Sequence, residues 1–270
     1  MPDTLASIPG APVDPTDAAL RPLLAAAGNI ALDGFRAVRG TAKADGSMVT
    51  AVDRSAEAVL AAGLSKAFPQ DGIIGEEGAS RRGSAATWFV DPLDGTRAFL
   101  EGLAHWGPTV ARVSEDGVLA GALWLPRIRE HFYVRDESEA FLDGRRLPML
   151  LHRSGAPDGS LFVPSRLLLH LRLRWPGRTR SLGSTAAHLA LVAEGGVEAC
   201  IVGPGWQPWD AAAGVALVRA VGAAVTTLDG SPLDFRSDVG TPFVAGTPRA
   251  VAWITAPGRI APLPDRGHRG

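Results

Sequence analysis

Apolar residues recur along the first part of the chain with the spacing of amphipathic helices. Residues 15–39 place leucine and isoleucine on one helical face, and residues 55–68 predict a second helix. Two short apolar runs follow at residues 73–74 and 88–90, each bounded by glycine or proline, which is typical of buried strands. This part of the chain therefore predicts two helices followed by strands.

The next part alternates apolar and polar residues, as strands of an antiparallel meander do. The acidic turn Glu115-Asp116-Gly117 separates two such runs and predicts a β-hairpin. Two helices followed by a meander indicate an α+β half that spans residues 15–148. The meander strands are expected at residues 109–113, 119–125, 130–135 and 139–142.

Beyond this half, strand-like and helical patterns alternate, which favours an α/β half at residues 149–260. The leucine-rich residues 167–173 are expected to be helical. The other expected strands lie at residues 161–163, 197–202, 224–228 and 243–246, and the other expected helices start near Ser184, at Asp210 and near Thr247.

Composition and charge narrow the class of protein. The 270 residues are 46% hydrophobic, which is enough for a core, and the net charge of -1 gives no reason to expect a nucleic-acid polymer or a membrane as partner. The single cysteine, Cys200, cannot form an internal disulfide and is expected to be a buried apolar residue. With no apolar run of about 18 residues and no secretory signal pattern, a cytoplasmic location is expected.

Asp91 and Asp94 follow a buried strand closely. Pro92 has no N–H for a further ladder bond and Gly95 permits a tight turn, so the strand is predicted to end there and the two carboxylates to converge. Carboxylates a few ångströms apart repel, and a hard divalent cation such as Mg²⁺ removes that repulsion. Residues 96–101 begin a predicted helix whose free N–H groups suit a phosphate, so metal and phosphate are expected to meet here.

Three motifs of this chain resemble those of the inositol monophosphatase family of metal-dependent phosphatases. Residues 91–96, Asp-Pro-Leu-Asp-Gly-Thr, resemble the family signature, with Gly75-Glu76-Glu77 upstream and Trp209-Asp210-Ala211-Ala212-Ala213-Gly214 downstream. The resemblance covers about residues 20–255. It implies a layered α-β-α-β-α sandwich like that of fructose 1,6-bisphosphatase, and a homodimer.

The resemblance also implies two or three Mg²⁺ ions in each active site. One ion would be held by Glu76, Asp91 and the Leu93 carbonyl, and a second by Asp91, Asp94 and Asp210. Without the resemblance, Glu76 reads as part of a solvated acidic loop and Asp210 as the cap of a helix.

For catalysis, the resemblance implies that Thr96 and Asp53 orient and deprotonate the attacking water, with Glu76 acting through its metal. The backbone N–H groups of Gly95 and Thr96 would bind phosphate oxygens. Asp53 also reads as the N-cap of the following helix, and both roles are compatible. Lys43, in the preceding loop, is a further match to the family.

The substrate pocket is expected to involve Gly183-Ser184-Thr185, which resembles a Gly-Ser-Ala-Ala stretch of the family, although Ser184 also reads as an ordinary helix cap. The other substrate-binding residues implied are Asp94, Gly95, Thr96 and Asp210.

One position departs from the family pattern. Relatives that act on inositol phosphate or histidinol phosphate carry an acid seven positions before the Trp-Asp aspartate, where this chain has Gly203. The Gly-Pro segment here is closer to relatives that cleave 3′-phosphoadenosine 5′-phosphate. Trp206 is then either a stacking face for a base or a packed residue.

The expected function is Mg²⁺-dependent hydrolysis of a small phosphorylated polyol or related metabolite, of the inositol 1-phosphate type, by a metal-activated water. The chain would thus be a phosphoric monoester hydrolase. The alternatives are a 3′-phosphoadenosine 5′-phosphate or histidinol-phosphate phosphatase, a sugar bisphosphatase, and a non-catalytic relative that binds metal or phosphate. The complete set of expected ligands favours an enzyme.

Overall fold

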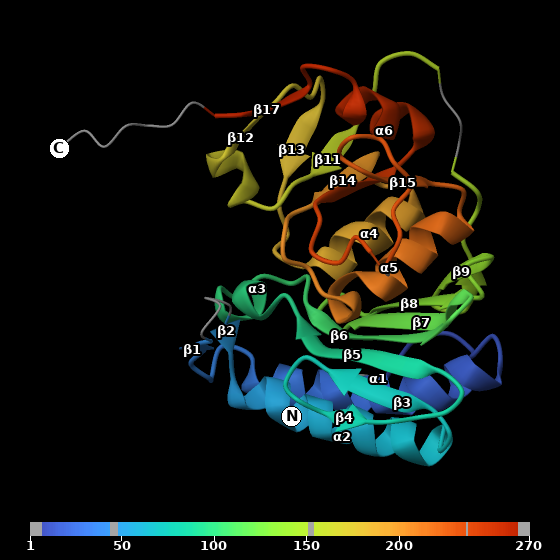
Figure 1. Ribbon diagram of the computed structural model, residues 1–270. Coiled ribbons are helices and arrows are strands. Elements are labelled where there is room, and N and C mark those ends of the chain that lie inside the picture. Colours follow the sequence, from blue (N-terminus) through green and yellow to red (C-terminus); the bar gives the residue numbers. More distant parts are fainter. Residues whose placement is uncertain (1–6, 44–47, 151–153, 236, 264–270) are drawn as a thin grey trace.

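The computed structural model describes residues 7–43, 48–150, 154–235 and 237–263, and Figure 1 shows them stacked in layers. Helices α1 (Pro15–Gly34) and α2 (Ala51–Ala67) form one outer layer below an eight-stranded sheet. Helices α4 (Thr185–Glu194) and α5 (Pro208–Ala220) form the middle layer, followed by a five-stranded sheet and by α6 (Pro248–Thr255). The expected α-β-α-β-α sandwich is confirmed. None of the described helices meets the length and apolarity that a bilayer span requires.

The larger sheet contains the predicted meander, and residues 72–75 and 80–81 add an antiparallel pair of strands at one edge. Its strands pair antiparallel except β3 (Gly72–Gly75) and β5 (Thr87–Asp94), which are parallel. In spatial order β10-β9-β8-β7-β6-β5-β3-β4, its strands are Arg145–Arg146, Glu139–Leu142, Glu130–Arg135, Gly117–Leu125, Gly107–Ser114, Thr87–Asp94, Gly72–Gly75 and Ser80–Arg81.

The smaller sheet is mixed, because β11 runs parallel to both of its neighbours and β16 antiparallel to both of its own. Its order β13-β11-β14-β16-β15 corresponds to Arg178–Arg180, Ser160–Phe162, Ala199–Val202, Phe243–Gly246 and Ala224–Thr227. Two further strand pairs join β1 (Thr41–Ala42) to β2 (Met48–Val49), and β12 (Leu171–Leu173) to β17 (Ile260–Pro262).

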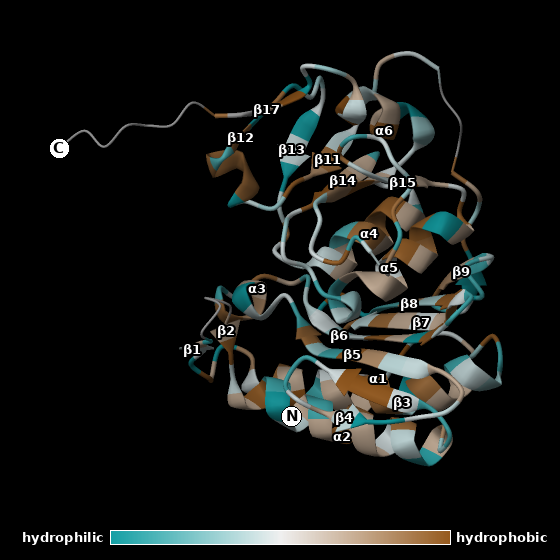
Figure 2. Ribbon diagram, in the orientation of Figure 1, coloured by the Kyte–Doolittle hydropathy of each residue, from teal (hydrophilic) through white to brown (hydrophobic). Residues whose placement is uncertain are grey.

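The middle helices are rich in small apolar residues, which lets them pack closely between the two sheets. Figure 2 shows hydrophobic colour along both α4 and α5. A Cβ added to Gly214 would lie 2.6 Å from the Leu189 side chain, so glycine permits this helix–helix approach. Because α5 belongs to the core that joins both sheets, the division into halves at residues 15–148 and 149–260 stays a prediction.

Several predicted boundaries were wrong. Helix α1 ends at Gly34 rather than near Arg39, because Phe35 leaves the helix and packs 5.2 Å from the Trp106 ring centroid. Helix α2 starts earlier than Ser55. The predicted helix at residues 167–173 is only one 3₁₀ turn, Leu167–Leu169, before the chain becomes β12 and pairs with the distant β17.

Strand β5 does not end at Pro92 as predicted. It continues to Asp94, and its pairing with β6 shifts register between Asp91 and Asp94. Proline therefore interrupts the ladder without ending the strand, which fits its missing N–H. This irregularity places two aspartates at the end of one strand, directly before α3 (Thr96–Leu100).

Candidate active site

Three carboxylates from two distant parts of the chain converge at one point. Asp91 and Asp94 come from the end of β5, and Asp210 comes from the first turn of α5. One ligand oxygen from each lies within 4.8 Å of the others. The predicted convergence of Asp91 and Asp94 is therefore confirmed, and α5 brings the third acid to them.

The backbone holds one oxygen of Asp91 and one of Asp210. Asp91 Oδ1 accepts a hydrogen bond of 2.8 Å from Leu93 N, and Asp210 Oδ2 accepts one of 2.7 Å from Gln207 N. Within the part of the chain that the structure describes, the second oxygen of these two residues accepts no hydrogen bond. Asp210 closes a capping box with Gln207, so it caps its helix and still presents an oxygen to the cluster.

Asp94 is held by the start of α4. Its Oδ2 accepts a hydrogen bond of 2.9 Å from Ala186 N and another from Ser184 Oγ. Ser184 is also the N-cap, as one reading of the sequence proposed, because its Oγ accepts a hydrogen bond of 3.0 Å from Ala187 N. Gly95 adopts φ +89°, and a Cβ there would lie 3.0 Å from Ser184 Cβ, so both conformation and space favour glycine.

The clustered acids hold protons more tightly than isolated ones. Burial, with the charges of Glu76, Asp94 and Asp210, raises the pKa of Asp91 well above its usual value. Burial raises the pKa of Asp94 to about 6 and that of Asp210 to about 7, with help from neighbouring carboxylates. A donor set made only of oxygen atoms, and destabilised by its own negative charge, fits a divalent cation such as Mg²⁺.

The metal-free protein is expected to lose stability as pH rises. Folded pKa values of about 6 and 7 for Asp94 and Asp210 lie above the unfolded value of 3.8, so the folded state binds the extra protons. Their contribution is complete below pH 3.8 and is lost by about pH 7. As the pH rises from 5 to 8, the Tm of the Asp210→Asn variant should fall by roughly 5 °C less than the Tm of the wild type. Identical Tm profiles of both proteins in EDTA would contradict this expectation.

Glu76 lies in the loop after β3, where other charged residues hold it. Lys43 Nζ donates hydrogen bonds of 2.8 Å to Glu76 Oε1 and 2.5 Å to Glu77 Oε1. Glu57, which the sequence analysis did not single out, accepts bonds of 2.7 Å from the backbone N–H groups of Glu77 and Ala79. Lys43 therefore supplies a positive charge beside Glu76, and buried Glu57 fixes the loop.

Asp53 and Thr96 form a second catalytic candidate. Thr96 Oγ1 lies 3.1 Å from Asp53 Oδ1 and 3.2 Å from the Leu93 carbonyl oxygen, and it can donate to either. Asp53 Oδ2 accepts bonds from Thr50 N at 2.8 Å and Thr50 Oγ1 at 2.6 Å. Thr50 is the N-cap of α2, so Asp53 is its capping-box partner rather than the cap itself. Burial raises the pKa of Asp53.

A pocket of about 360 Å³ opens onto this cluster. It brings together Glu76, Leu93, Thr96 and the three aspartates, whereas Asp53 reaches it only through Thr96. Thr185 lines an adjoining pocket of about 440 Å³ together with Gly183 and Ser184. The pocket of about 360 Å³, called the metal pocket below, is lined by Met48, Glu76, Asp91, Leu93, Asp94, Gly95, Thr96, Arg97, Arg166, Gly183 and Asp210.

Three lining residues were missed from the sequence. Arg97 directly follows the Asp-Pro-Leu-Asp-Gly-Thr motif, and that adjacency was the signal available. Met48 and Arg166 lie in segments without a motif, so only the fold brings them to the pocket.

Trp206 is a packed residue and not a stacking face. Its side chain is 3% exposed, and its Nε1 donates a hydrogen bond of 2.7 Å to the Thr241 carbonyl oxygen. The rings of Phe235 and Phe243 meet it edge-on. The space beside Gly203 holds Pro164, 3.6 Å from where a Cβ would lie.

Other single residues are structural as expected. His188 stacks on Phe162, with ring centroids 4.6 Å apart, and its Nε2 accepts a hydrogen bond from Leu182 N. Burial lowers the pKa of His188 to about 4, so the ring is neutral near pH 7. Cys200 is fully buried.

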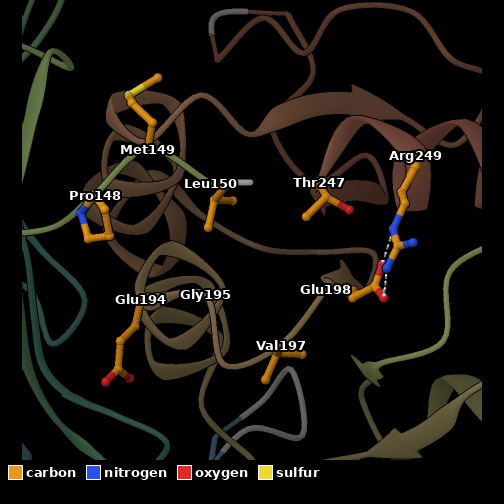
Figure 3. Close-up of a pocket in the computed structure, with 9 residues that line it drawn as sticks. All are labelled: Pro148, Met149, Leu150, Glu194, Gly195, Val197, Glu198, Thr247 and Arg249. Carbon is orange, nitrogen blue, oxygen red and sulfur yellow. Dashed lines mark hydrogen bonds and ion pairs between the residues drawn. The ribbon is translucent and has the colours of Figure 1, made fainter. Parts of the chain in front are cut away.

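A separate pocket of about 250 Å³ lies beside the end of α4 and the start of α6 (Figure 3). Its Arg249 pairs with Glu198 at 2.6 Å and, outside the pocket lining, with Asp158 at 2.8 Å. The positive charge of Arg249 is thus already neutralised. Asp91, Asp94 and Asp210, in contrast, have no ion-pair partner among the described residues.

An acid cluster in a pocket of about 360 Å³, in this layered sandwich, is the arrangement of a metal-dependent phosphatase. The chain matches the Inositol monophosphatase family over residues 13–257 and therefore belongs to that family. Its members are phosphatases that use metal ions and act on small phosphate esters.

Individual relatives agree with this placement. The chain is 31% identical over 190 residues to a fructose-1,6-bisphosphatase/inositol-1-monophosphatase of Thermotoga maritima, covering 68% of this chain and 72% of the relative. It is 31% identical over 207 residues to a histidinol-phosphatase of Chlorobaculum parvum, covering 73% and 79%. The crystal structure of the extragenic suppressor protein suhB of Bartonella henselae matches with a TM-score of 0.78 and 26% identity, over 90% of this chain and 97% of that one.

Proposed function

We propose that this protein is a Mg²⁺-dependent phosphomonoesterase that hydrolyses a small phosphorylated metabolite with an activated water molecule. One observation carries the proposal. Asp91, Asp94 and Asp210 present oxygens within 4.8 Å of one another in a pocket that also contains Thr96. Near neutral pH, bound cations would relieve the repulsion within this cluster, and a water beside Thr96 would lie next to a general base, Asp53.

The residues that would hold the metal follow from the family pattern and the pocket. One Mg²⁺ would bind Glu76, Asp91 and the Leu93 carbonyl, and a second would bind Asp91, Asp94 and Asp210, with two or three ions per active site. When bound, these ions supply Lewis-acid stabilisation of charge on the phosphate and on the leaving oxygen. Glu76 can take this role once it exchanges its bond to Lys43.

The side chains of the protein would direct the water. A water hydrogen-bonded to Thr96 Oγ1 donates its proton to that hydroxyl, which passes its own proton to Asp53 Oδ1. Burial favours the protonated form of Asp53 and so helps it accept. The backbone N–H groups of Gly95 and Thr96 would bind phosphate oxygens, and no residue becomes phosphorylated.

The leaving group would occupy the adjoining pocket. Gly183, Ser184 and Thr185 line it, and Gly183 belongs to both pockets. Asp94 and Asp210 would also meet substrate hydroxyls beside the metal ions. Sugar bisphosphates and histidinol phosphate are alternative substrates to test, since relatives carry fructose-bisphosphatase and histidinol-phosphatase names. A third alternative, 3′-phosphoadenosine 5′-phosphate, follows only from the Gly-Pro segment before Trp209. Because the Trp206 ring is buried, it cannot stack on a base, and one argument for the nucleotide substrate is lost. A homodimer and a cytoplasmic location stay predictions.

Phosphate release measured with and without Mg²⁺ tests the proposed activity. The panel should contain inositol 1-phosphate, histidinol phosphate, fructose 1,6-bisphosphate and 3′-phosphoadenosine 5′-phosphate. We expect release from at least one ester that EDTA abolishes and Mg²⁺ restores, because the proposed mechanism uses cations bound at the acid cluster. Release that is indifferent to EDTA would contradict the metal-dependent mechanism. Metal binding without release from any ester would favour a non-catalytic binding protein.

A further inference from the structure

Two arginines border both the metal pocket and the adjoining pocket. Arg97 comes from the first turn of α3, and Arg166 comes from the loop after β11. Both line the metal pocket of about 360 Å³ and the adjoining pocket of about 440 Å³. They therefore lie where the scissile phosphate of a bound substrate would join the rest of that substrate.

Neither guanidinium is neutralised by the protein. Among the described residues, Arg97 and Arg166 have no side-chain hydrogen bond, ion pair or aromatic partner, and both residues are exposed. Arg112 and Arg249, in contrast, are paired with carboxylates. Two free guanidinium groups beside a pocket are available for an anion, which each can bind through two parallel N–H donors.

Mg²⁺ bound at the acid cluster would balance the scissile phosphate, so the arginines would offer charge beyond what one phosphate needs. The only acid among the described residues that line the adjoining pocket is Glu101, which does not line the metal pocket. The residues that line both pockets are Arg97, Arg166 and Gly183, so the charge that the two pockets share is positive.

We propose that the natural substrate carries a second anionic group, a phosphate or a carboxylate, which Arg97 and Arg166 bind beside the scissile phosphate. This inference rests on the proposed phosphomonoesterase function and names its substrate class. Apolar side chains of the adjoining pocket, including Leu103 and Leu182, pack against the carbon frame that joins the two anions. A substrate with a cationic amine, such as histidinol phosphate, does not suit this pair of arginines.

Matched esters separate the second anion from the scissile phosphate. Glycerol 2-phosphate and 2-phosphoglycerate differ by one hydroxymethyl group in place of a carboxylate, and fructose 1-phosphate and fructose 1,6-bisphosphate differ by a second phosphate. The wild type should prefer, in kcat/KM, the member that carries the second anionic group in at least one pair, and the preferred pair identifies the anion. Arg97→Gln and Arg166→Gln should each reduce that preference about 10- to 100-fold. Arg82→Gln removes an exposed guanidinium that lines neither pocket and should keep it.

Calorimetric binding of the same esters to Asp53→Asn gives a readout that does not need turnover. Weaker binding of the ester that carries the second anionic group after Arg166→Gln is added would support the second-anion site. Equal loss for both members of a pair would overturn it, because the arginines would then serve the scissile phosphate. Preference for histidinol phosphate would also overturn it. Absent hydrolysis of every ester would defeat the proposed function, and the calorimetry would still decide whether the arginines bind a second anion.

Discussion

Replacing Asp91 with asparagine is expected to abolish Mg²⁺-dependent phosphate release while the fold survives. Asp91 is the acid that both proposed metal positions share, so its loss should lower kcat/KM on the order of 10³-fold. The same change should raise the Tm of the metal-free protein, because burial and three neighbouring acids make the ionised form unfavourable and raise the pKa. Phosphate release and thermal unfolding in EDTA measure the two effects.

Asp71→Asn provides a matched control with a buried aspartate outside the site. Asp71 accepts hydrogen bonds from Trp88 Nε1 at 2.9 Å and from Arg112 Nε at 2.7 Å, so its replacement should lower Tm. Mg²⁺ should still raise the Tm of Asp71→Asn but not that of Asp91→Asn. An Asp91→Asn enzyme that keeps wild-type turnover would remove the shared-ligand assignment.

Replacing Asp53 with asparagine should lower kcat about 10²- to 10⁴-fold, the range of a lost general base. Asparagine keeps an oxygen that can accept from Thr50, but it cannot take the proton that Thr96 passes on. Mg²⁺ binding, followed by the Tm shift, should change little, because Asp53 is outside the three-acid cluster. Steady-state kinetics and the Mg²⁺-dependent Tm together test the role.

Thr50→Ala separates this catalytic role from helix capping. Thr50 is the N-cap of α2, and its loss should cost about 1 kcal/mol of stability. If Asp53 acts chiefly as a general base, Thr50→Ala should keep most activity while Asp53→Asn loses it. Parallel losses of stability and activity in both variants would indicate that Asp53 serves only the capping box.

The local parts of the fold were predictable, whereas distant pairings were not. The meander strands at residues 130–135 and 139–142 were found because alternation and turn residues specify them locally. The end of α1 was missed because Phe35 turns away to join Trp106, a contact made across the chain. Residues 171–173 were predicted to be helical because their strand partner, β17 at residues 260–262, is far away in the sequence.

The residues of the candidate site divide in the same way, into those that a local motif specifies and those that only long-range contacts bring to the pocket. Asp91, Asp94 and Asp210 were found because they stand in motifs, and the structure brings them together. The motifs carry no signal for Glu57, which holds the loop of Glu76 from the middle of a helix. Arg166 lies in an irregular loop, and only the meeting of two sheets and their connecting helices places it near Arg97.

The hydrogen bonds from the start of α4 to Asp94 make the geometry of the metal pocket depend on contacts between distant parts of the chain. Ser184 and Asp94 are 90 positions apart, and no local element can bring them together. A growing chain that has reached only β5 contains Asp91 and Asp94, but neither the groups that orient Asp94 nor the third carboxylate. The complete site therefore requires that α4 and α5 have docked against the end of β5.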